Sequence, residues 1–437
     1  MSIYLLLGLY ILIVIGLSYY YSDNSSTEAY LISNRDRNSF HILASKFAGA
    51  VGVSTFITYT GYAYRFGAIG VAALMLGILI GYNFFAFWAA PKIKKLSLAG
   101  NFYTQGDLVS HVTKDQKIGK FTNIVTVIIQ FFWILLSLVG GAKVIDLFGI
   151  LPYTPALLLT ATVILIYILL SGLKAVIITD VIQTFIILIL LALLVYHLIH
   201  QNTYSFSALL NVEPPQRLKA GSVIGLLLYG ALSVFGLADR YQLCYAAKDI
   251  NTAKKGMSLA VIPIIIIGGL LLFVGLSTLA QNNTLNYDDA FIHAMQHLIA
   301  PEYTPILLVL FFAGLMSSAD TNIFAVASHT AVHQQEASIS TTRKHIVIVV
   351  IIATVIALFW KDIVDITLVG AALRLTLAVP MIYVLRGGEH HYRFLGATIG
   401  GILALIVGVI AVGITPLLAL LVLVGTLLGL LYQGKKD

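Results

Sequence analysis

Long apolar segments recur along almost the whole chain, and they restrict its fold more than any other feature. A helix that crosses a bilayer needs roughly 20 mostly apolar residues, so the sequence predicts about 13 spans. They lie near residues 3–21, 41–66, 68–90, 120–148, 153–171, 176–199, 220–238, 257–280, 303–330, 345–360, 363–385, 394–412 and 415–433. Only 10% of the 437 residues are charged, against about 25% in soluble domains. The sequence therefore predicts an all-α polytopic membrane protein, with lipid as its main solvent.

The basic residues predict how the chain is oriented. The net charge of +7 does not indicate nucleic acid binding, because Lys and Arg lie in short loops between spans. One set of alternate loops carries most of them, including Arg35, Arg37, Lys92, Lys94, Lys95, Lys174, Arg240, Lys248, Arg343, Lys344, Arg386 and the tail residues Lys435 and Lys436. The positive-inside rule puts these loops in the cytoplasm. We expect the plasma (inner) membrane, an external amino terminus and a cytoplasmic carboxyl terminus. Because residues 1–21 lack a basic start and a cleavage site, we expect a retained helix.

Motifs for enzyme chemistry are lacking in the sequence. It shows no catalytic carboxylate pair and no nucleophile elbow. Cys244 is the only cysteine, which excludes an internal disulfide. His293 and His297 are four residues apart, but no third ligand is near them in the sequence. We expect no enzyme, no cofactor, no metal other than sodium and no obligate protein partner.

Two predicted spans are interrupted by small residues, near 48–55 and near 230–236. They lie five spans apart, so the second has the opposite direction to the first. Paired broken helices in two inverted halves point to the binding site of a transporter. Alternatively, these glycines only allow helices to pack closely.

Four motifs, in order along the chain, resemble those of the sodium/solute symporter family, which transports proline, sugars, sialic acid, pantothenate and monocarboxylates. The resemblance covers roughly residues 28–390. The motifs are an acidic-aromatic lead-in at 27–35, the family signature at 171–183, an Arg-Tyr-Gln segment at 239–248 and a Met-Ser-Ser motif at 313–321. Asp239 stands where the family usually has Gln. The resemblance implies sodium-coupled transport.

The resemblance also implies a fold of five-plus-five inverted repeats, as in the leucine transporter. On that layout residues 1–40 form a leading helix and a cytoplasmic loop. The first repeat is expected over 41–199 and the second over 200–390. Two trailing helices and a short tail occupy 391–437.

A candidate sodium site follows from the same motifs. Sodium prefers oxygen ligands, and Gly314, Ser317 and Ser318 share one helical face. By resemblance, the ligands would be the carbonyls of Ala48, Val51 and Gly314 with the side chains of Ser317 and Ser318. Alternatively, the two serines bond to carbonyls of their own helix.

Asp180 is a second candidate ion ligand. A carboxylate inside a membrane is costly and is a functional candidate by default. By resemblance, it would lie on the sodium exit path or help to bind a second sodium. Alternatively, Asp180 or Thr179 caps the start of a helix.

Depth in the membrane gives candidate solute contacts, and the resemblance implies that they lie between core helices one, three, six, eight and ten. The candidates are Ser54, Thr55, Thr58, Tyr82, Asn83, Trp133, Tyr229, Ser233 and Arg374. Arg374 either binds an anionic group of the solute or pairs with Asp320 or Asp365.

Other charged residues have structural interpretations. Lys143 and Asp146 are expected to form a local pair, and the sequence assigns no role to Lys46. Arg35 matches an inner-gate arginine of the family, or it is an interfacial residue.

The sequence as a whole predicts a sodium-coupled symporter that imports a small organic solute by alternating access. An amino acid or a carboxylate fits better than a sugar, because the familiar sugar-binding polar set is absent. The alternatives are a proton-coupled transporter of the same fold, with Asp180 as relay, and a membrane sensor that does not transport.

Overall fold

A computed structural model describes residues 3–23, 25–200, 206–297, 303–331 and 339–432. Within these ranges the secondary structure is helical, apart from an isolated bridge between Arg37 and Ala247. This confirms the all-α prediction. The tail residues Lys435 and Lys436, used above for orientation, lie outside the described residues.

The helices follow one another along the chain with short connections. The first half contains α1 Ile3–Tyr21, α2 Thr27–Ile32, η1 Ser33–Arg35, α3 Ser39–Ala50, α4 Val53–Phe84, η2 Phe85–Ala89, α5 Ala90–Ala99, α6 Gln105–Thr113, α7 Gln116–Leu147, α8 Tyr153–Leu170, α9 Leu173–His200 and α10 Phe206–Leu210. The second half contains α11 Ala220–Leu232, η3 Ser233–Gly236, α12 Ala238–Ala246, α13 Ile250–Leu259, α14 Val261–Gln281, η4 Tyr287–Asp289, α15 Ala290–His297, α16 Thr304–Ala331, α17 Ile339–Ala357, α18 Ile363–Leu385, α19 His391–Val412 and α20 Leu417–Leu430.

The number of membrane spans stays a prediction. By length and composition, 8 helices of the described residues are long and apolar enough to cross a membrane, or 9 with one bent pair. Helices α1 and α20 are apolar but shorter. The boundary predicted between the spans 41–66 and 68–90 coincides with a kink in α4, where Gly67 is non-helical and its φ of 72° suits glycine. Within the first of these spans, α3 ends at Ala50.

Both predicted helix breaks are present. Between α3 and α4, Gly52 is extended with φ −106° and ψ −174°. Between η3 and α12, Leu237 is extended, and the two helical parts meet at 46°. Extended residues interrupt the hydrogen-bond ladder of a helix, so backbone groups near them are available for other partners.

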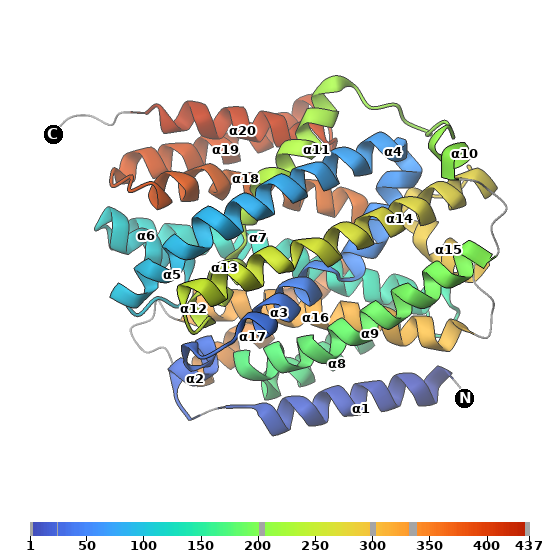
Figure 1. Cartoon of the computed structure of the whole chain (residues 1–437), viewed down its shortest axis with the longest axis horizontal. Helices are drawn as coiled ribbons and strands as arrows, with labels where there is room; N and C mark the ends of the chain where they lie inside the picture. The colour runs from blue at the N-terminus through green and yellow to red at the C-terminus, as the bar shows by residue number, and fades with distance from the viewer. Residues whose placement is uncertain (1–2, 24, 201–205, 298–302, 332–338, 433–437) are drawn as a thin grey trace.

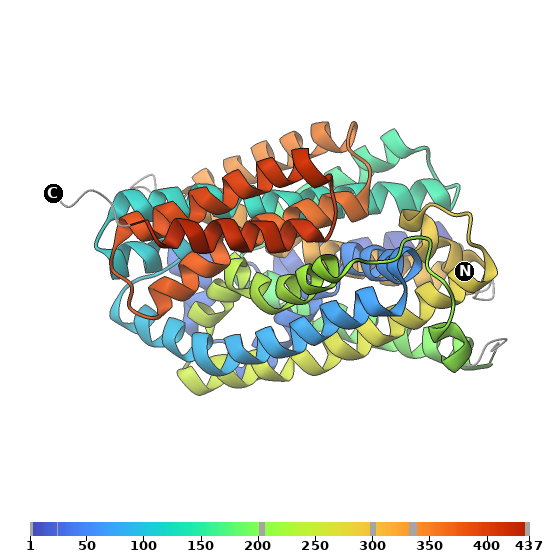
Figure 2. The same ribbon diagram turned by 90° about the horizontal axis from the view of Figure 1, so that it is seen from above.

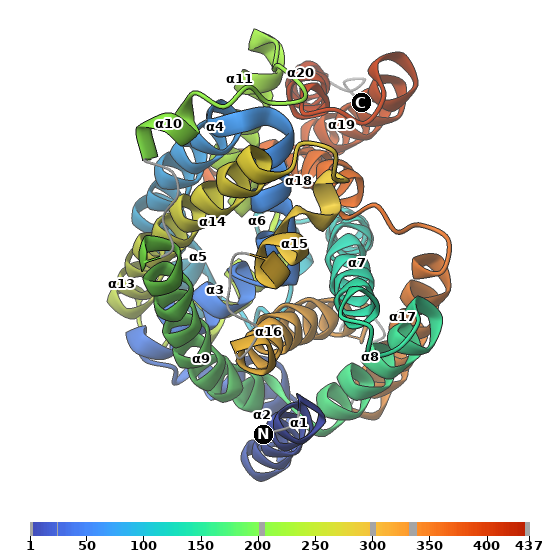
Figure 3. The same ribbon diagram turned by 90° about the vertical axis from the view of Figure 1, so that its right-hand side faces the viewer.

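Helix α16 lies in the middle of the bundle. In the end-on view α16 and α3 are surrounded by α4, α7, α9, α14 and α18 (Figure 3). The most apolar window of α16 is 89% buried, against 28% for α19. Helix α1 lies at one edge of the bundle, and α19 and α20 run side by side at the other (Figures 1 and 2). The central position of α16 places the Met-Ser-Ser motif at the core.

Small residues let α4 and α11 pack closely. A Cβ on Gly81 would lie 1.9 Å from the carbonyl oxygen of Ala231, and one on Gly77 would lie 2.1 Å from that of Leu227. Such contacts allow helix backbones to approach in a membrane. The two helices form one wall of the central cavity described below.

Candidate ion and solute site

The break between α3 and α4 lies directly against α16. A Cβ built on Gly52 would lie 1.7 Å from Ser318 Oγ and 3.1 Å from the carbonyl oxygen of Gly314. A Cβ on Gly314 would lie 3.3 Å from the carbonyl oxygen of Val51. Three oxygens predicted as sodium ligands therefore converge beside Gly52. A side chain at position 52 would fill the space between them.

The other two predicted ligands lie next to this cluster. The carbonyl oxygen of Ala48 accepts a bond of 3.2 Å from the amide of Val51. Ser317 Oγ donates to Asp180 Oδ1 at 2.5 Å and so does not bond to its own helix. The two serines thus have different partners: Ser318 lies at the helix break, and Ser317 contacts the carboxylate.

Asp180 is held by hydroxyl groups from two helices. Its Oδ2 accepts from Ser45 Oγ at 2.5 Å, and its side chain is fully buried. It lies seven residues after Leu173, the first residue of α9, so the helix-cap interpretation of Asp180 is wrong. The structure brings Asp180 to the predicted ion ligands by way of Ser317.

A second buried carboxylate, Asp320, lies on α16 three residues after Ser317. Asp320 accepts a bond from the hydroxyl of Tyr167, which also lies 2.6 Å from the hydroxyl of Thr179. The carboxylate of Asp320 therefore has its partner on α8, within the bundle.

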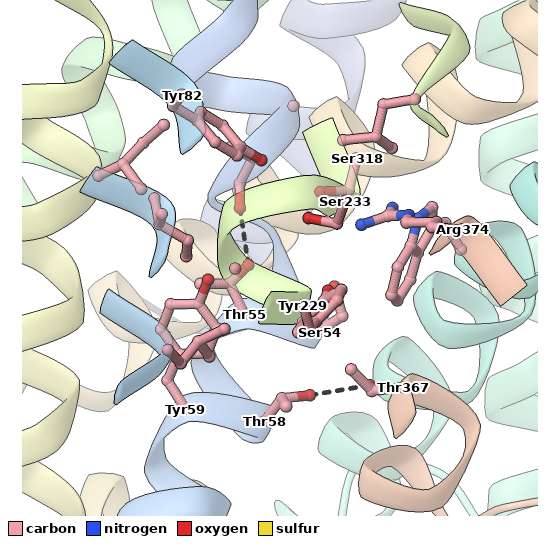
Figure 4. Close-up of a pocket in the computed structure, with 18 of the residues that line it drawn as sticks. Ser54, Thr55, Thr58, Tyr59, Tyr82, Tyr229, Ser233, Ser318, Thr367 and Arg374 are labelled. Atoms are coloured by element: carbon pink, nitrogen blue, oxygen red, sulfur yellow. Dashed lines mark hydrogen bonds between the residues drawn. The ribbon is translucent and has the colours of Figure 1, made fainter. Parts of the chain in front are cut away.

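A central cavity adjoins the predicted ion ligands and holds about 830 Å³ of empty space, including its opening. Ser318 lines this cavity, so the predicted ion site and the cavity share a side chain. Eight of the nine predicted solute contacts line it. They are Trp133 and the residues labelled in Figure 4, namely Ser54, Thr55, Thr58, Tyr82, Tyr229, Ser233 and Arg374. Asn83 is not among the lining residues. Its amide donates to the carbonyl of Leu79 at 2.8 Å, so the structure gives no support to a solute contact there.

Some of the lining hydroxyl groups already have partners. Thr55 donates to the carbonyl of Ala50 at 2.7 Å, and Thr58 lies 3.0 Å from the hydroxyl of Thr367 (Figure 4). Thr367 was not predicted. It lies on α18, two turns before Arg374, and only the fold reveals that this face meets α4.

Arg374 lines the cavity without a carboxylate beside it among the described residues. Its guanidinium carbon lies 3.5 Å from the ring centre of Trp133, and its nitrogens point toward Ser233 (Figure 4). The proposed partners are engaged elsewhere: Asp365 lies 3.7 Å from Arg65, and Asp320 bonds to Tyr167. The alternative that Arg374 pairs with either carboxylate is therefore wrong.

Lys46, to which the sequence assigned no role, is buried near the cavity. Its ammonium lies 3.6 Å from the ring centre of Tyr82, which lines the cavity. In the part of the chain that the structure describes, Lys46 Nζ has no hydrogen-bond partner. A cation over an aromatic ring is stabilised by the electrons of the ring, but less than by an anion.

Asp239 and Arg240 form a buried ion pair that lines the cavity, and sequence analysis did not propose either as a contact. The sequence did contain one indication that Asp239 belongs to the site. Asp239 departs from the Gln of the family, and among the described residues it is the one acidic side chain of the cavity wall.

Arg35 belongs to a cluster that connects two loops. Its Nε donates to Glu28 at 2.7 Å, and Nη2 donates to the carbonyl of Phe102 at 3.1 Å. Tyr103 donates to the same carboxylate at 2.7 Å. Burial and this bond to Glu28 raise the pKa of Tyr103 to about 12. The cluster joins the entry of α3 to the loop before α6.

The ion-pair partner of Lys143 differs from the predicted one. It lies 3.0 Å from Asp288, whereas its predicted partner Asp146 is exposed. Asp288 is fully buried and also accepts from the amides of Ile363 and Val364, at 2.7 and 3.0 Å. Asp288 is bound to the start of α18, and α18 packs against α7, which carries Lys143. Local spacing along α7 does not show this contact.

Comparison with known proteins gives matches to symporters. Residues 30–385 match the sodium:solute symporter family. The sodium/pantothenate symporter of Haemophilus influenzae is 23% identical over 316 residues, which cover 68% of this chain and 64% of that relative. An uncharacterized symporter of Bacillus subtilis is 25% identical over 167 residues, 38% of this chain and 29% of that protein. The chain thus spans less than two thirds of the length of either relative.

Two solved structures share the fold. A sodium-coupled sialic acid symporter, in a substrate-bound outward-open state, superposes with a TM-score of 0.74 at 15% identity, over 99% of this chain and 98% of that one. Mhp1, a nucleobase-cation-symport-1 family transporter in a closed conformation with bromovinylhydantoin bound, gives 0.66 at 12% identity, over 91% and 92%.

Proposed function

Because the chain belongs to the sodium:solute symporter family, we propose that it imports a small organic solute together with sodium. The observation that carries this proposal is the position of Ser318. Its hydroxyl lies beside Gly52 with the carbonyls of Val51 and Gly314, and it also lines the central cavity. An ion held there would lie next to a solute in the cavity.

Sodium fits the chemistry of these ligands. It is a hard cation that takes oxygen ligands, and broken helices expose carbonyls for this purpose in transporters. Val51, Gly314 and Ser318 supply three oxygens, and we propose Ala48 and Ser317 as the others. The space beside Gly52, which a Cβ would fill, supports a ligand at this point.

Asp180 is proposed to extend the ion site. Ser317 lies between the ion ligands and this carboxylate, and Ser45 contacts it from α3. A sodium that leaves the first site by way of Ser317 would meet Asp180. We therefore propose Asp180 as a ligand of a second sodium or as a step on the exit path.

The solute is proposed to be a carboxylate or an amino acid. Arg374 offers a guanidinium in the cavity, and guanidinium groups bind carboxylates through paired hydrogen bonds. Trp133 supports the guanidinium from one side. The proposed uncharged contacts of the solute are Ser54, Thr55, Thr58, Tyr82, Tyr229 and Ser233.

The two breaks support alternating access. The α3/α4 break and the η3/α12 break both border the cavity. We propose that the repeats, 41–199 and 200–390, move around this cavity, with the amino terminus outside and Arg35 at the inner gate. Moving one charge through 100 mV contributes about 2.3 kcal/mol, and a tenfold sodium gradient adds about 1.4 kcal/mol. Together they support accumulation of roughly several hundredfold per sodium.

Uptake into proteoliposomes tests the proposal. An inward sodium gradient should drive uptake of at least one member of a panel of labelled carboxylates and amino acids, and an equal potassium gradient should not. Uptake that follows a pH gradient and ignores sodium would select the proton-coupled alternative. Binding of the solute without any uptake would select the sensor.

A further inference from the structure

Asp239 keeps one carboxylate oxygen without a partner. Its ion pair with Arg240 joins Asp239 Oδ2 to Arg240 Nη1. The other oxygen, Oδ1, is buried and accepts no hydrogen bond from the residues that the structure describes. An ionised carboxylate oxygen only accepts hydrogen bonds, so a donor is needed to satisfy it. Because Asp239 lines the cavity, a group held there is well placed to supply that donor.

Arg240 has the complementary need. Its Nε is a buried donor that has no acceptor within the described ranges, although Nη1 is used by Asp239. The two residues are only 5% and 2% exposed, so bulk water does not satisfy either atom. A buried polar atom without a partner is unfavourable. Since the charges of Asp239 and Arg240 already balance, the pair lacks hydrogen bonds and does not lack a counter-ion.

The part of the cavity wall around Arg374 offers donors. Arg374 Nε and Trp133 Nε1 are buried, and neither has an acceptor in the described part of the chain. This part adjoins the segment that leads to Asp239. A Cβ on Gly236, three residues before Asp239, would lie 2.4 Å from the carbonyl oxygen of Arg374. The cavity is thus bordered by a guanidinium without a carboxylate and, on the adjoining segment, by a neutral ion pair with one free acceptor and one free donor.

We propose that Asp239 and Arg240 recognise a hydroxyl or carboxamide group on a solute whose carboxylate is bound by Arg374. The group donates to Asp239 Oδ1 and accepts from Arg240 Nε. This inference rests on the proposed transport function and narrows its solute to carboxylates with one negative charge and an uncharged polar group. Asp239 is then a specificity-determining residue.

Other solute classes satisfy fewer of these atoms. An ammonium group only donates, so an amino acid would leave Arg240 Nε without an acceptor and bring a second cation beside that guanidinium. A second carboxylate only accepts, so it would leave Asp239 Oδ1 without a donor. A carboxylate with a plain alkyl chain would satisfy neither atom. Hydroxyl and carboxamide groups both donate and accept.

Matched probes test the inference on the purified protein. Ligand-induced thermal stabilisation is measured in sodium for carboxylates of four to six carbons. Each parent acid is compared with derivatives that carry a hydroxyl, carboxamide, methoxy or ammonium group at the same carbon. The methoxy group accepts hydrogen bonds but does not donate them. We expect at least one hydroxyl or carboxamide derivative to bind about tenfold to hundredfold more tightly than the parent, methoxy and ammonium compounds, as hydrogen bonds to charged groups predict.

A double variant assigns this preference to the ion pair. Asp239→Leu/Arg240→Met removes both partners together, because replacing a whole buried pair by apolar residues is often neutral for stability whereas breaking it is not. The affinity ratio of the preferred derivative to its parent should fall close to one, while the parent acid still binds. Asp36→Leu/Arg37→Met, which removes an adjacent Asp-Arg pair that does not line the cavity, is the matched control and should keep the wild-type ratio.

The outcomes separate this inference from the symport proposal. If no hydroxyl or carboxamide derivative binds more tightly than its parent and its methoxy ether, the inference is wrong. It is also wrong if the ammonium derivative binds most tightly, or if the double variant keeps the wild-type ratio, which would leave Asp239 and Arg240 a purely structural pair. Stabilisation by sodium in any of these cases would leave the symport proposal standing. The expected preference without any response to sodium would support the inference and contradict sodium coupling.

Discussion

Ser317 Oγ donates to Asp180 Oδ1 at 2.5 Å, and this bond joins the central helix α16 to α9. The next residue, Ser318, faces the α3/α4 break at Gly52. Two consecutive serines thus connect a buried carboxylate with a cluster of carbonyl oxygens. We propose that this arrangement offers sodium a continuous series of oxygen ligands, and the predictions below test its parts.

Gly52→Ala should abolish stabilisation by sodium. The new Cβ would lie 1.7 Å from Ser318 Oγ, so the hydroxyl must move away from the carbonyls of Val51 and Gly314. The measurement is the melting temperature against sodium concentration. Gly269→Ala is the matched control, because nothing lies within 4 Å of a Cβ there. A Gly52→Ala protein that responds to sodium like the wild type would place the ion elsewhere.

Asp180→Asn should weaken the ion response without removing it. The amide oxygen can still accept from one of Ser45 and Ser317, and the amide nitrogen can donate to the other serine, but the negative charge is lost. We expect the sodium concentration for half-maximal stabilisation to rise by about tenfold, the order of one charged hydrogen bond. Asp146→Asn, an exposed carboxylate of α7, is the control. An unchanged sodium response in Asp180→Asn would exclude Asp180 from the ion path.

Asp288→Ala should destabilise the fold strongly. It would leave Lys143 without its anion and the amides of Ile363 and Val364 without their acceptor. Breaking a buried ion pair costs about 3–5 kcal/mol. Thermal unfolding without sodium or solute measures this loss. Glu213→Ala, which breaks the exposed pair with Arg217, should have little effect. Equal melting temperatures for the two variants would refute the anchoring role of Asp288.

Much of the fold could be predicted because membrane helices need long apolar segments, which are visible in any single sequence. The breaks at 48–55 and 230–236 were predictable for a similar reason, since small residues interrupt those segments. The boundary between 41–66 and 68–90 was predictable as well, because Gly67 supplies the positive φ at which the two helical parts of α4 meet.

The candidate site was predictable where a motif carried it. Ser317, Ser318 and Gly314 lie in one motif, whereas the partners of Lys143 and Arg374 depend on long-range contacts. Lys143 lies 145 positions from Asp288 in the chain. Arg374 was weighed against Asp320 and Asp365 as partners, but the fold gives those carboxylates Tyr167 and Arg65 instead. Spacing along one helix shows local pairs and hides such contacts.

The most direct test of the central claim is thermal stability in sodium against potassium at equal ionic strength, for the wild type and Ser318→Ala. A ligand that binds only the folded state stabilises it by mass action, by about 2.7 kcal/mol at one hundred times its Kd. We predict that sodium raises the melting temperature of the wild type and that Ser318→Ala loses most of this response. Equal stability in sodium and potassium, or an undiminished sodium response in Ser318→Ala, would contradict a sodium site between the α3/α4 break and α16.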